Sequence, residues 1–257
     1  MEFFFVWGVA LGYADDMLWK KTWEPEAVLA LLGGIVASFV CGGLASGLLR
    51  QAHLPGFRND ESVGSVLLAT LSFHGAALVL GTVFLSVHGS NWREAFGKTG
   101  WKHCLALAVI ILLAISPLMY FLKWASDFVL MELRVPTEDQ AAVKMILGSK
   151  LWLRYYLIFF AVILAPVAEE FVFRGLLFST AKRYGWRRTG WIGCSLLFAL
   201  IHFNAPTFLP LFLLALALTW LYDVTEGLLA PIIAHSLFNA ANLALLLVAE
   251  KYKLLSP

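Results

Sequence analysis

The stretch LWLRYYLIFFAVILAPVAEEFVFRGLLF, residues 151–178, decides the fold of this chain. A helix that spans a bilayer needs about 20 mostly apolar residues, and this stretch is long and apolar enough. It also holds two adjacent carboxylates and an arginine: Glu169, Glu170 and Arg174. Ionisable groups are costly in hydrocarbon, so their presence at this depth indicates a functional site. The alternative is a salt-bridged helix end at the membrane interface.

The whole chain shares this apolar character. Of its 257 residues, 60% are hydrophobic and 14% are charged, whereas a soluble domain carries about 25% charged residues. We therefore predict an integral, multi-pass membrane protein. The net charge of +2 is too small to indicate nucleic-acid binding. The cysteines Cys41, Cys104 and Cys194 include no CxxC pair, and we interpret them as buried hydrophobic side chains.

Apolar stretches predict seven membrane helices, and an eighth if the apolar N-terminus, residues 1–12, inserts. The seven stretches are 27–49, 62–87, 105–122, the one beginning at 151, 191–203, 208–222 and 228–249. The expected fold class is an all-α, polytopic membrane helical bundle. We interpret 1–257 as a single domain, with N-terminal helices at 1–122, a polar connection at 123–150 and a C-terminal core at 151–249.

The polar connection carries one more helix signal. Residues 137–140, Thr-Glu-Asp-Gln, resemble a capping box. Apolar residues at 141–147 then follow the spacing of an amphipathic helix of two or three turns. Such a helix would lie on the membrane surface, or would cover the opening of an active site.

Basic residues orient the chain only locally. With the loops at 13–26, 89–103, 182–189 and 223–227 on one side, Lys and Arg divide nine against nine, Arg174 left aside. The positive-inside rule therefore does not orient the whole chain. The segment 182–188 holds four basic residues and no acid, which favours a cytoplasmic position for this loop. We expect the inner (plasma) membrane of a prokaryote.

Helical geometry separates the two adjacent acids. Glu170 and Arg174 are four residues apart, so they share a helix face and can pair. Glu169 points about 100° away from Glu170 and is free to face another group. A lone carboxylate in an apolar site is suited to general acid or base chemistry.

Two later segments add polar groups. His202 lies within an apolar run and, counting about 1.5 Å per residue from the basic loop, reaches a depth similar to that of Glu169. His235 and Asn239 are four residues apart on one helix face, and Asn242 falls within about 20° of His235. The same counting places His235 nearer the membrane surface. We expect these residues to line one water-filled cavity.

Three motifs occur in order on apolar segments. They are Glu169-Glu170-x-x-x-Arg174, Phe198-x-x-x-His202 and His235-x-x-x-Asn239. Together they resemble the motif series of the CPBP family, the CAAX-prenyl-endopeptidase-like and bacteriocin-processing proteases, also called glutamic intramembrane proteases. The resemblance covers residues 151–248, whereas residues 1–122 match only as generic membrane helices.

The resemblance implies a metal-independent endopeptidase that cleaves a peptide bond in or beside the membrane. Glu169 would activate a water molecule as general base, and His202 would assist that water and shuttle a proton. These roles fit the need of peptide hydrolysis for a positioned base.

The resemblance also implies roles for the remaining motif residues. Glu170 and Arg174 would hold the catalytic pair in place. His235 and Asn239 would form the oxyanion hole, which donates hydrogen bonds to the tetrahedral intermediate. The expected partners are the lipid bilayer and a membrane-associated protein or peptide substrate, such as a C-terminal tail or a peptide precursor.

Other interpretations stay open. Two carboxylates and two histidines could bind zinc, although the chain has no HExxH motif; metal analysis and activity in chelator would separate the two mechanisms. A transporter or a membrane scaffold is the non-enzymatic alternative, but the chain shows no repeated halves. The remaining histidines, His53, His74, His88 and His103, are interpreted as solvated or structural and placed outside the site.

Overall fold

The computed structural model describes residues 23–59, 62–135 and 141–252, with the backbone alone for 141–144. All regular structure in these residues is helical, as the sequence predicts. The predictions for residues 1–12 and 137–140 lie outside the described residues. The helix expected at 141–147 is present as Ala141–Gly148, and its Ile146 packs in a small apolar cluster with Val66, Leu153 and Leu157.

The described helices follow the predicted stretches closely. They are α1 (Pro25–Gln51), α2 (Val63–Thr70), η2 (Leu71–Gly75), α3 (Ala76–Val87), α4 (Trp92–Phe96), α5 (Trp101–Glu132), α6 (Ala141–Gly148), α7 (Leu151–Phe159), η3 (Phe160–Leu164), α8 (Ala165–Glu170), η4 (Phe171–Phe178), α9 (Ser179–Arg183), α10 (Arg187–Leu200), α11 (Ala205–Thr225) and α12 (Leu229–Lys251). The η elements are wide π-helical turns that continue the α-helices beside them.

Six helices of the described residues are long and apolar enough to cross a membrane. They are Pro25–Gln51, Val63–Val87, Trp101–Glu132, Leu151–Arg183, Ala205–Thr225 and Leu229–Lys251. The seventh predicted helix, at 191–203, forms as α10, but its 14 residues fall short of the about 20 that a span needs. The integral-membrane class is therefore supported, and the count of seven or eight spans is not confirmed.

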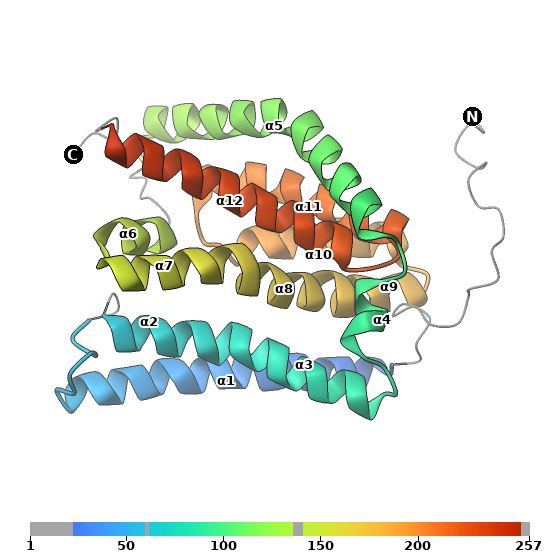
Figure 1. Ribbon diagram of the computed structural model, residues 1–257, viewed down its shortest axis with the longest axis horizontal. Coiled ribbons are helices and arrows are strands. Elements are labelled where there is room, and N and C mark those ends of the chain that lie inside the picture. The colour runs from blue at the N-terminus through green and yellow to red at the C-terminus, as the bar shows by residue number, and fades with distance from the viewer. Residues whose placement is uncertain (1–22, 60–61, 136–140, 253–257) are drawn as a thin grey trace.

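Helix α5 extends further than its apolar stretch. It continues ten residues past Leu122, into the segment interpreted as the start of the polar connection. Lys123 Nζ donates to Asp127 Oδ1 at 2.6 Å, an i,i+4 ion pair that supports the extra turns. Figure 1 shows α5 bent in the middle, and Pro117 lies inside it, a residue that kinks helices because it lacks an N–H donor.

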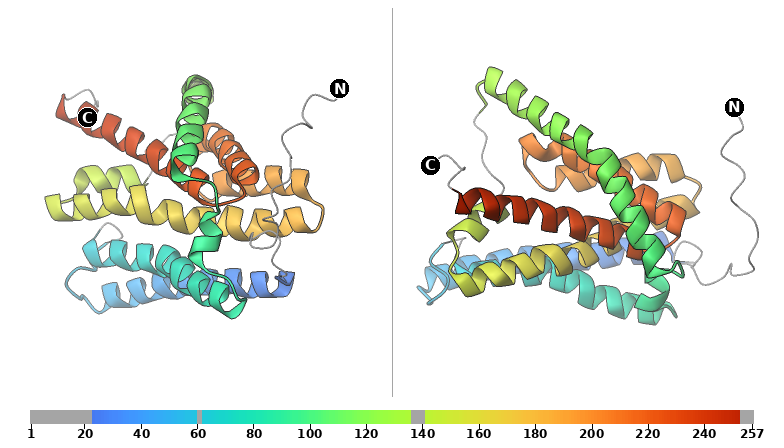
Figure 2. Two further views of the ribbon diagram at one scale, coloured as in Figure 1. Left: turned by 45° about the vertical axis from the view of Figure 1, so that its right-hand side comes forward. Right: turned by 45° about the horizontal axis from the view of Figure 1, so that its top comes forward.

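The helix of residues Leu151–Arg183 lies at the centre of the bundle. In Figure 1 the pair formed by α1 and α2–α3 lies on one side of it, and α5 and α10–α12 lie on the other; the left view of Figure 2 agrees. Half of its apolar window is buried inside the protein, against 22% for Pro25–Gln51. Ionisable residues on this helix can therefore face other helices rather than lipid.

A glycine brings the N-terminal pair close to the central helix. A Cβ added to Gly81 of α3 would lie 2.5 Å from Cε1 of Phe171 in η4. Trp92 of α4 packs on the same phenylalanine ring, with ring centroids 4.9 Å apart. Small residues let membrane helices approach in this way. This contact fixes the position of α3, and of the η2 turn before it, against the acidic segment.

A second close approach joins α4 to the turn between α11 and α12. Gly97 has a φ of +85°, and a Cβ on Gly227 would lie 2.6 Å from the Cα of Gly97. The amide of Leu228 donates to the carbonyl of Ala95 at 2.9 Å, and the Thr99 hydroxyl donates to the Thr225 carbonyl at 3.0 Å. The two glycines therefore allow backbone to pack directly on backbone.

We expect Gly227→Ala to lower the free energy of unfolding by about 1–3 kcal/mol, because its methyl group must displace backbone atoms. The matched control is Gly193→Ala in α10, where an added Cβ meets no atom within 4 Å. That change should be neutral or stabilise by up to about 1 kcal/mol. Thermal unfolding of both variants in detergent micelles tests this. Equal midpoints for the two variants would contradict the proposed close contact.

Candidate active site

The deepest polar contact is an ion pair between Glu170 and Arg174. Arg174 Nη1 donates to Glu170 Oε1 at 2.9 Å, and both side chains are 0% exposed. The pairing predicted from their spacing is therefore present. A buried charge is tolerated only when it is paired and hydrogen-bonded. Glu170 Oε2 has no hydrogen-bond partner among the described residues, so the pair relies on Oε1.

Arg174 also ties the central helix to α11. Its Nη2 donates to the Ala215 carbonyl at 3.0 Å, and its Nε donates to the Thr219 hydroxyl at 3.2 Å. The guanidinium carbon lies 5.0 Å from the centre of the Phe198 ring, within range of a cation–π contact. The arginine therefore links residues of three helices around Glu170.

His235 of α12 contacts both acids. Its Nδ1 lies 2.8 Å from Glu170 Oε1, and because a carboxylate only accepts, the ring donates this hydrogen bond. Its Nε2 lies 3.8 Å from Glu169 Oε2. Counting along the helix placed His235 nearer the membrane surface; the structure instead places it at the level of the acids. Helix tilt, which the sequence does not encode directly, accounts for the difference.

Besides His235, Glu169 contacts a histidine that was predicted to lie outside the site. His74 Nε2 lies 3.1 Å from Glu169 Oε1, with side-chain exposures of 18% and 13%. The assignment of His74 as merely structural did not anticipate this contact. Counting about 1.5 Å per residue back from the loop at 89–103 places His74 about 21 Å from that loop. Glu169 lies about 20 Å from its own loop by the same count. Depth counting could therefore have predicted that His74 lies near Glu169.

His202 is held by its own helix end. Its Nδ1 lies 2.7 Å from the Phe198 carbonyl, which can only accept, so Nδ1 carries the proton. The rings of Phe198 and His202 have centroids 4.7 Å apart. No hydrogen bond joins His202 to Glu169 within the described part of the chain.

Asn239 is bonded to the central helix. Its side-chain amide donates to the Ala161 carbonyl at 2.8 Å. Asn242, one turn further along α12, is exposed and donates to the Phe238 carbonyl of its own helix, so it does not support the site. The structure thus groups Glu169, Glu170, Arg174 and His235 by direct contact and leaves Asn239 bonded beside them.

Each π-helical turn in the described part of the chain supplies a group to this region. The turn η2 contains His74, η3 contains Ala161, whose carbonyl Asn239 engages, and η4 contains Arg174. Isolated π turns are rare and occur frequently at functional sites. Three of them around one cluster support a functional assignment of the cluster.

The described residues include no group of three or more His, Cys, Asp or Glu side chains arranged to hold a metal ion. Glu169 and Glu170 are each engaged by a different histidine nitrogen at hydrogen-bonding distance. The chemistry that this arrangement supports is proton transfer between a carboxylate and imidazoles.

Comparison with known families locates the same region. The family model described as "Type II CAAX prenyl endopeptidase Rce1-like" matches residues 151–241, from the start of α7 to just beyond Asn239. This segment is an Rce1-like domain. The Rce1-like family is a family of membrane proteases, so the CPBP resemblance of the sequence motifs is confirmed. No curated protein and no solved structure matches the chain.

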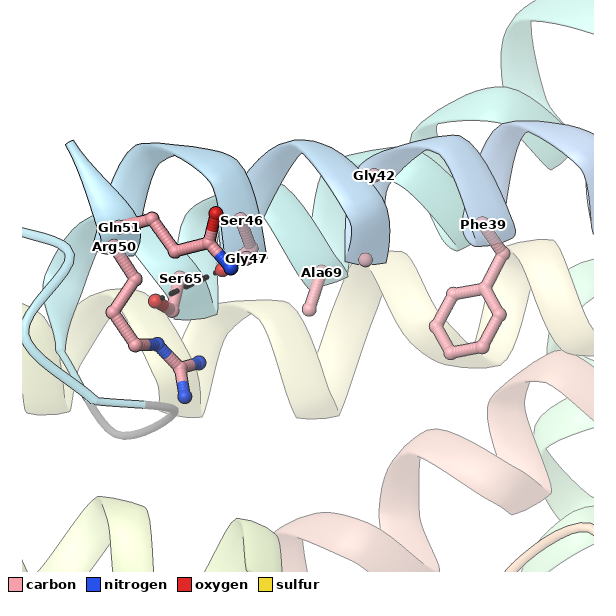
Figure 3. A pocket seen from close by; sticks show the side chains of 9 residues that line it. Phe39, Gly42, Ser46, Gly47, Arg50, Gln51, Ser65 and Ala69 are labelled. Atoms are coloured by element: carbon pink, nitrogen blue, oxygen red, sulfur yellow. Dashed lines mark hydrogen bonds between the residues drawn. The ribbon is translucent and has the colours of Figure 1, made fainter.

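One cavity lies outside the Rce1-like domain. It has a volume of about 400 Å³ and runs between α1 and α2, from Phe39 at one end to Arg50 and Gln51 at the other (Figure 3). Its lining includes none of the six predicted site residues and not His74. The cavity is therefore not part of the candidate active site.

We expect Arg174→Leu to lower the free energy of unfolding by about 3–5 kcal/mol, because it leaves the Glu170 charge buried without its partner. The control is Arg187→Leu, whose guanidinium is 55% exposed where it pairs with Asp223 and should cost less than about 1 kcal/mol. Denaturant unfolding in detergent micelles compares the two. A cost for Arg174→Leu no larger than for Arg187→Leu would show that the buried pair does not stabilise the Rce1-like domain.

Proposed function

We propose that the protein is an intramembrane endopeptidase in which Glu169 activates the water that attacks a peptide bond. The observation that carries this proposal is the asymmetry of the two acids. Glu170 is fully buried and bonded to Arg174, whereas Glu169 is 13% exposed and contacts histidines. A general base must be reachable and must exchange protons with its neighbours. Glu169 meets this requirement and Glu170 does not.

His202 is proposed to assist the water and shuttle the proton. Because its Nδ1 proton is held by the Phe198 carbonyl, the other nitrogen of the neutral ring is an acceptor. The ring can therefore receive a proton at Nε2 without changing its anchoring bond. Its position supports this role, because the Phe198 ring packs against both His202 and His235.

His235 and Asn239 are proposed to stabilise the oxyanion. His235 donates from Nδ1 to Glu170, which orients the ring; when the ring carries both protons, its Nε2 can donate to a developing negative charge. Asn239 uses one N–H for the Ala161 carbonyl, and its amide has a second N–H to donate. In this proposal Glu170 and Arg174 hold His235 in position.

The proposed substrate is a membrane-associated protein or peptide, such as a C-terminal tail or a peptide precursor. A cavity of about 360 Å³ lies between α12 and the α7–η3 segment, and only apolar residues line it. It includes Ala240 and Val162, the neighbours in sequence of Asn239 and Ala161. An apolar segment beside the scissile bond would suit such a surface.

The proposed location is the inner membrane of a prokaryote, with the loop 182–188 on the cytoplasmic side. Trp186 and Tyr184 in this loop are 69% and 52% exposed. Exposed Trp and Tyr beside basic residues are typical of the membrane–water interface.

We expect Glu169→Gln to lower the cleavage rate by on the order of 10²–10⁴-fold, because it removes the base and keeps the side-chain shape. The matched control is Glu250→Gln on α12, whose carboxylate pairs with Arg154 away from the site. Membrane-peptide termini are compared between cells that carry the wild-type chain and each variant. A precursor should accumulate with Glu169→Gln only; identical termini in all three would refute the protease proposal.

We expect Asn239→Ala to lower the rate by about 10²–10³-fold if its amide serves the oxyanion hole. Asn242→Ala, on the same helix but exposed and outside the site, is the control and should change the rate by less than about twofold. The rates are measured on a fluorogenic peptide that spans the cleavage site identified by the comparison of membrane-peptide termini. Equal rates for the two variants would remove Asn239 from the proposed mechanism.

A further inference from the structure

The residue that contacts Glu169 most closely comes from the N-terminal half of the chain. His74 lies in η2, 77 residues before the segment 151–241 that matches the Rce1-like family begins (151 − 74). Its Nε2 is 3.1 Å from Glu169 Oε1. The sequence motifs that indicate the function therefore do not include every residue at the proposed catalytic base.

Two other part-buried histidines show how a ring is oriented by its own helix. The Nδ1 atoms of His88 and His202 are 2.8 and 2.7 Å from the carbonyl four residues earlier in the chain. His74 makes no such bond: its buried Nδ1 has no hydrogen-bond partner among the described residues. The hydrogen bond of the His74 ring is the one to Glu169, so the ring is oriented by the acid and not by its own backbone.

The balance of charge at Glu169 also points to His74. A carboxylate at membrane depth needs donors or a counter-charge. The arginine of this region, Arg174, is committed to Glu170. The groups at salt-bridge distance from Glu169 are His74 at 3.1 Å and His235 at 3.8 Å, one at each oxygen. Since a carboxylate only accepts, His74 Nε2 donates to Oε1.

Aromatic packing fixes the plane of the His74 ring. Phe73 and Phe160 meet it edge to face, with centroid separations of 4.9 and 4.8 Å. One turn before His74, Thr70 shares a hydrogen bond of 2.9 Å with Tyr156 of the central helix. These contacts hold η2 against the central helix, so the donor stays aimed at Glu169.

We propose that His74 is a positioning residue for Glu169, donating from Nε2 to Oε1 so that Oε2 is presented to the water and to His235. The inference rests on the proposed function of Glu169 as general base. It adds that the catalytic site is incomplete within the Rce1-like segment and requires a donor from η2. Because the water and the substrate do not touch His74 in this arrangement, it acts through the carboxylate.

The test compares His74→Leu with His74→Gln in the full chain, reconstituted in lipid vesicles. Leucine fills the space of the ring but has no hydrogen-bond donor. Glutamine can place its side-chain N–H close to the position that His74 Nε2 occupies. We expect His74→Leu to lower kcat by about 10–100-fold, the loss typical of a hydrogen bond to a charged group. KM should change by less than about threefold, because the bond orients the base and does not bind substrate. His74→Gln should recover kcat to within about fivefold of wild type.

The matched control is His88→Leu. His88 lies at the end of the same helix and packs against Trp23 and Phe84, but it does not contact Glu169. Its replacement should lower the unfolding temperature and leave kcat unchanged. The substrate in all cases is the fluorogenic peptide defined by the cleavage site in the membrane-peptide comparison, and thermal unfolding is recorded for every variant.

The outcomes separate this inference from the function it rests on. If wild type cleaves, Glu169→Gln does not, and His74→Leu cleaves at the wild-type rate, the positioning role is refuted and the protease proposal stands. If His74→Gln is as slow as His74→Leu or slower, His74 acts by packing and the inference fails. If wild type and Glu169→Gln behave alike, the protease proposal itself fails, and the role of His74 fails with it.

Discussion

Two opposite charges, Glu170 and Arg174, meet at 2.9 Å with neither side chain exposed. Inside a membrane such a pair persists only if its surroundings satisfy it, because an unpaired charge there costs several kcal/mol. The surroundings are residues of α11 and α12: the Ala215 carbonyl, the Thr219 hydroxyl and the His235 ring. The pair therefore holds three helices together and engages Glu170, so that Glu169 is the acid proposed to act as the base.

The sequence predicts the helices well because their signal is strong and local. Each apolar stretch is long, and helix geometry alone pairs Glu170 with Arg174 and turns Glu169 away from them. The sequence predicts poorly the axial position and the tilt of each helix relative to its neighbours. His235 is closer to the acids than counting along the chain suggests, because tilt and the π turns change depth without leaving a pattern in the residues. The length of α5 was underestimated because an ion pair at Lys123 and Asp127 extends it beyond its apolar residues.

His74 illustrates a different limit. A single histidine within an apolar span has no periodic partner, so on composition alone it reads as a structural residue. The role of His74 depends on which side chain of another helix it faces, and only the tertiary structure shows this. The close packing of Gly81 on Phe171 explains why His74 reaches Glu169. This contact brings the N-terminal helices within hydrogen-bonding distance of the acidic segment. The fold therefore brings a residue of the N-terminal half to the proposed catalytic base, although the family motifs lie within residues 151–241.

The contact between Gly97 and Gly227 restricts how α12 can move. Backbone packs on backbone at this point, and the amide of Leu228 donates to the Ala95 carbonyl, so the start of α12 is held against α4. His235 follows Gly227 by only about 12 Å of helix rise. The contact between Gly97 and Gly227 therefore helps to set the position of His235 along the helix axis relative to the acids. The far end of α12 is held as well, because Glu250 pairs with Arg154 of α7, so the position of His235 beside the acids is fixed from both ends of the helix.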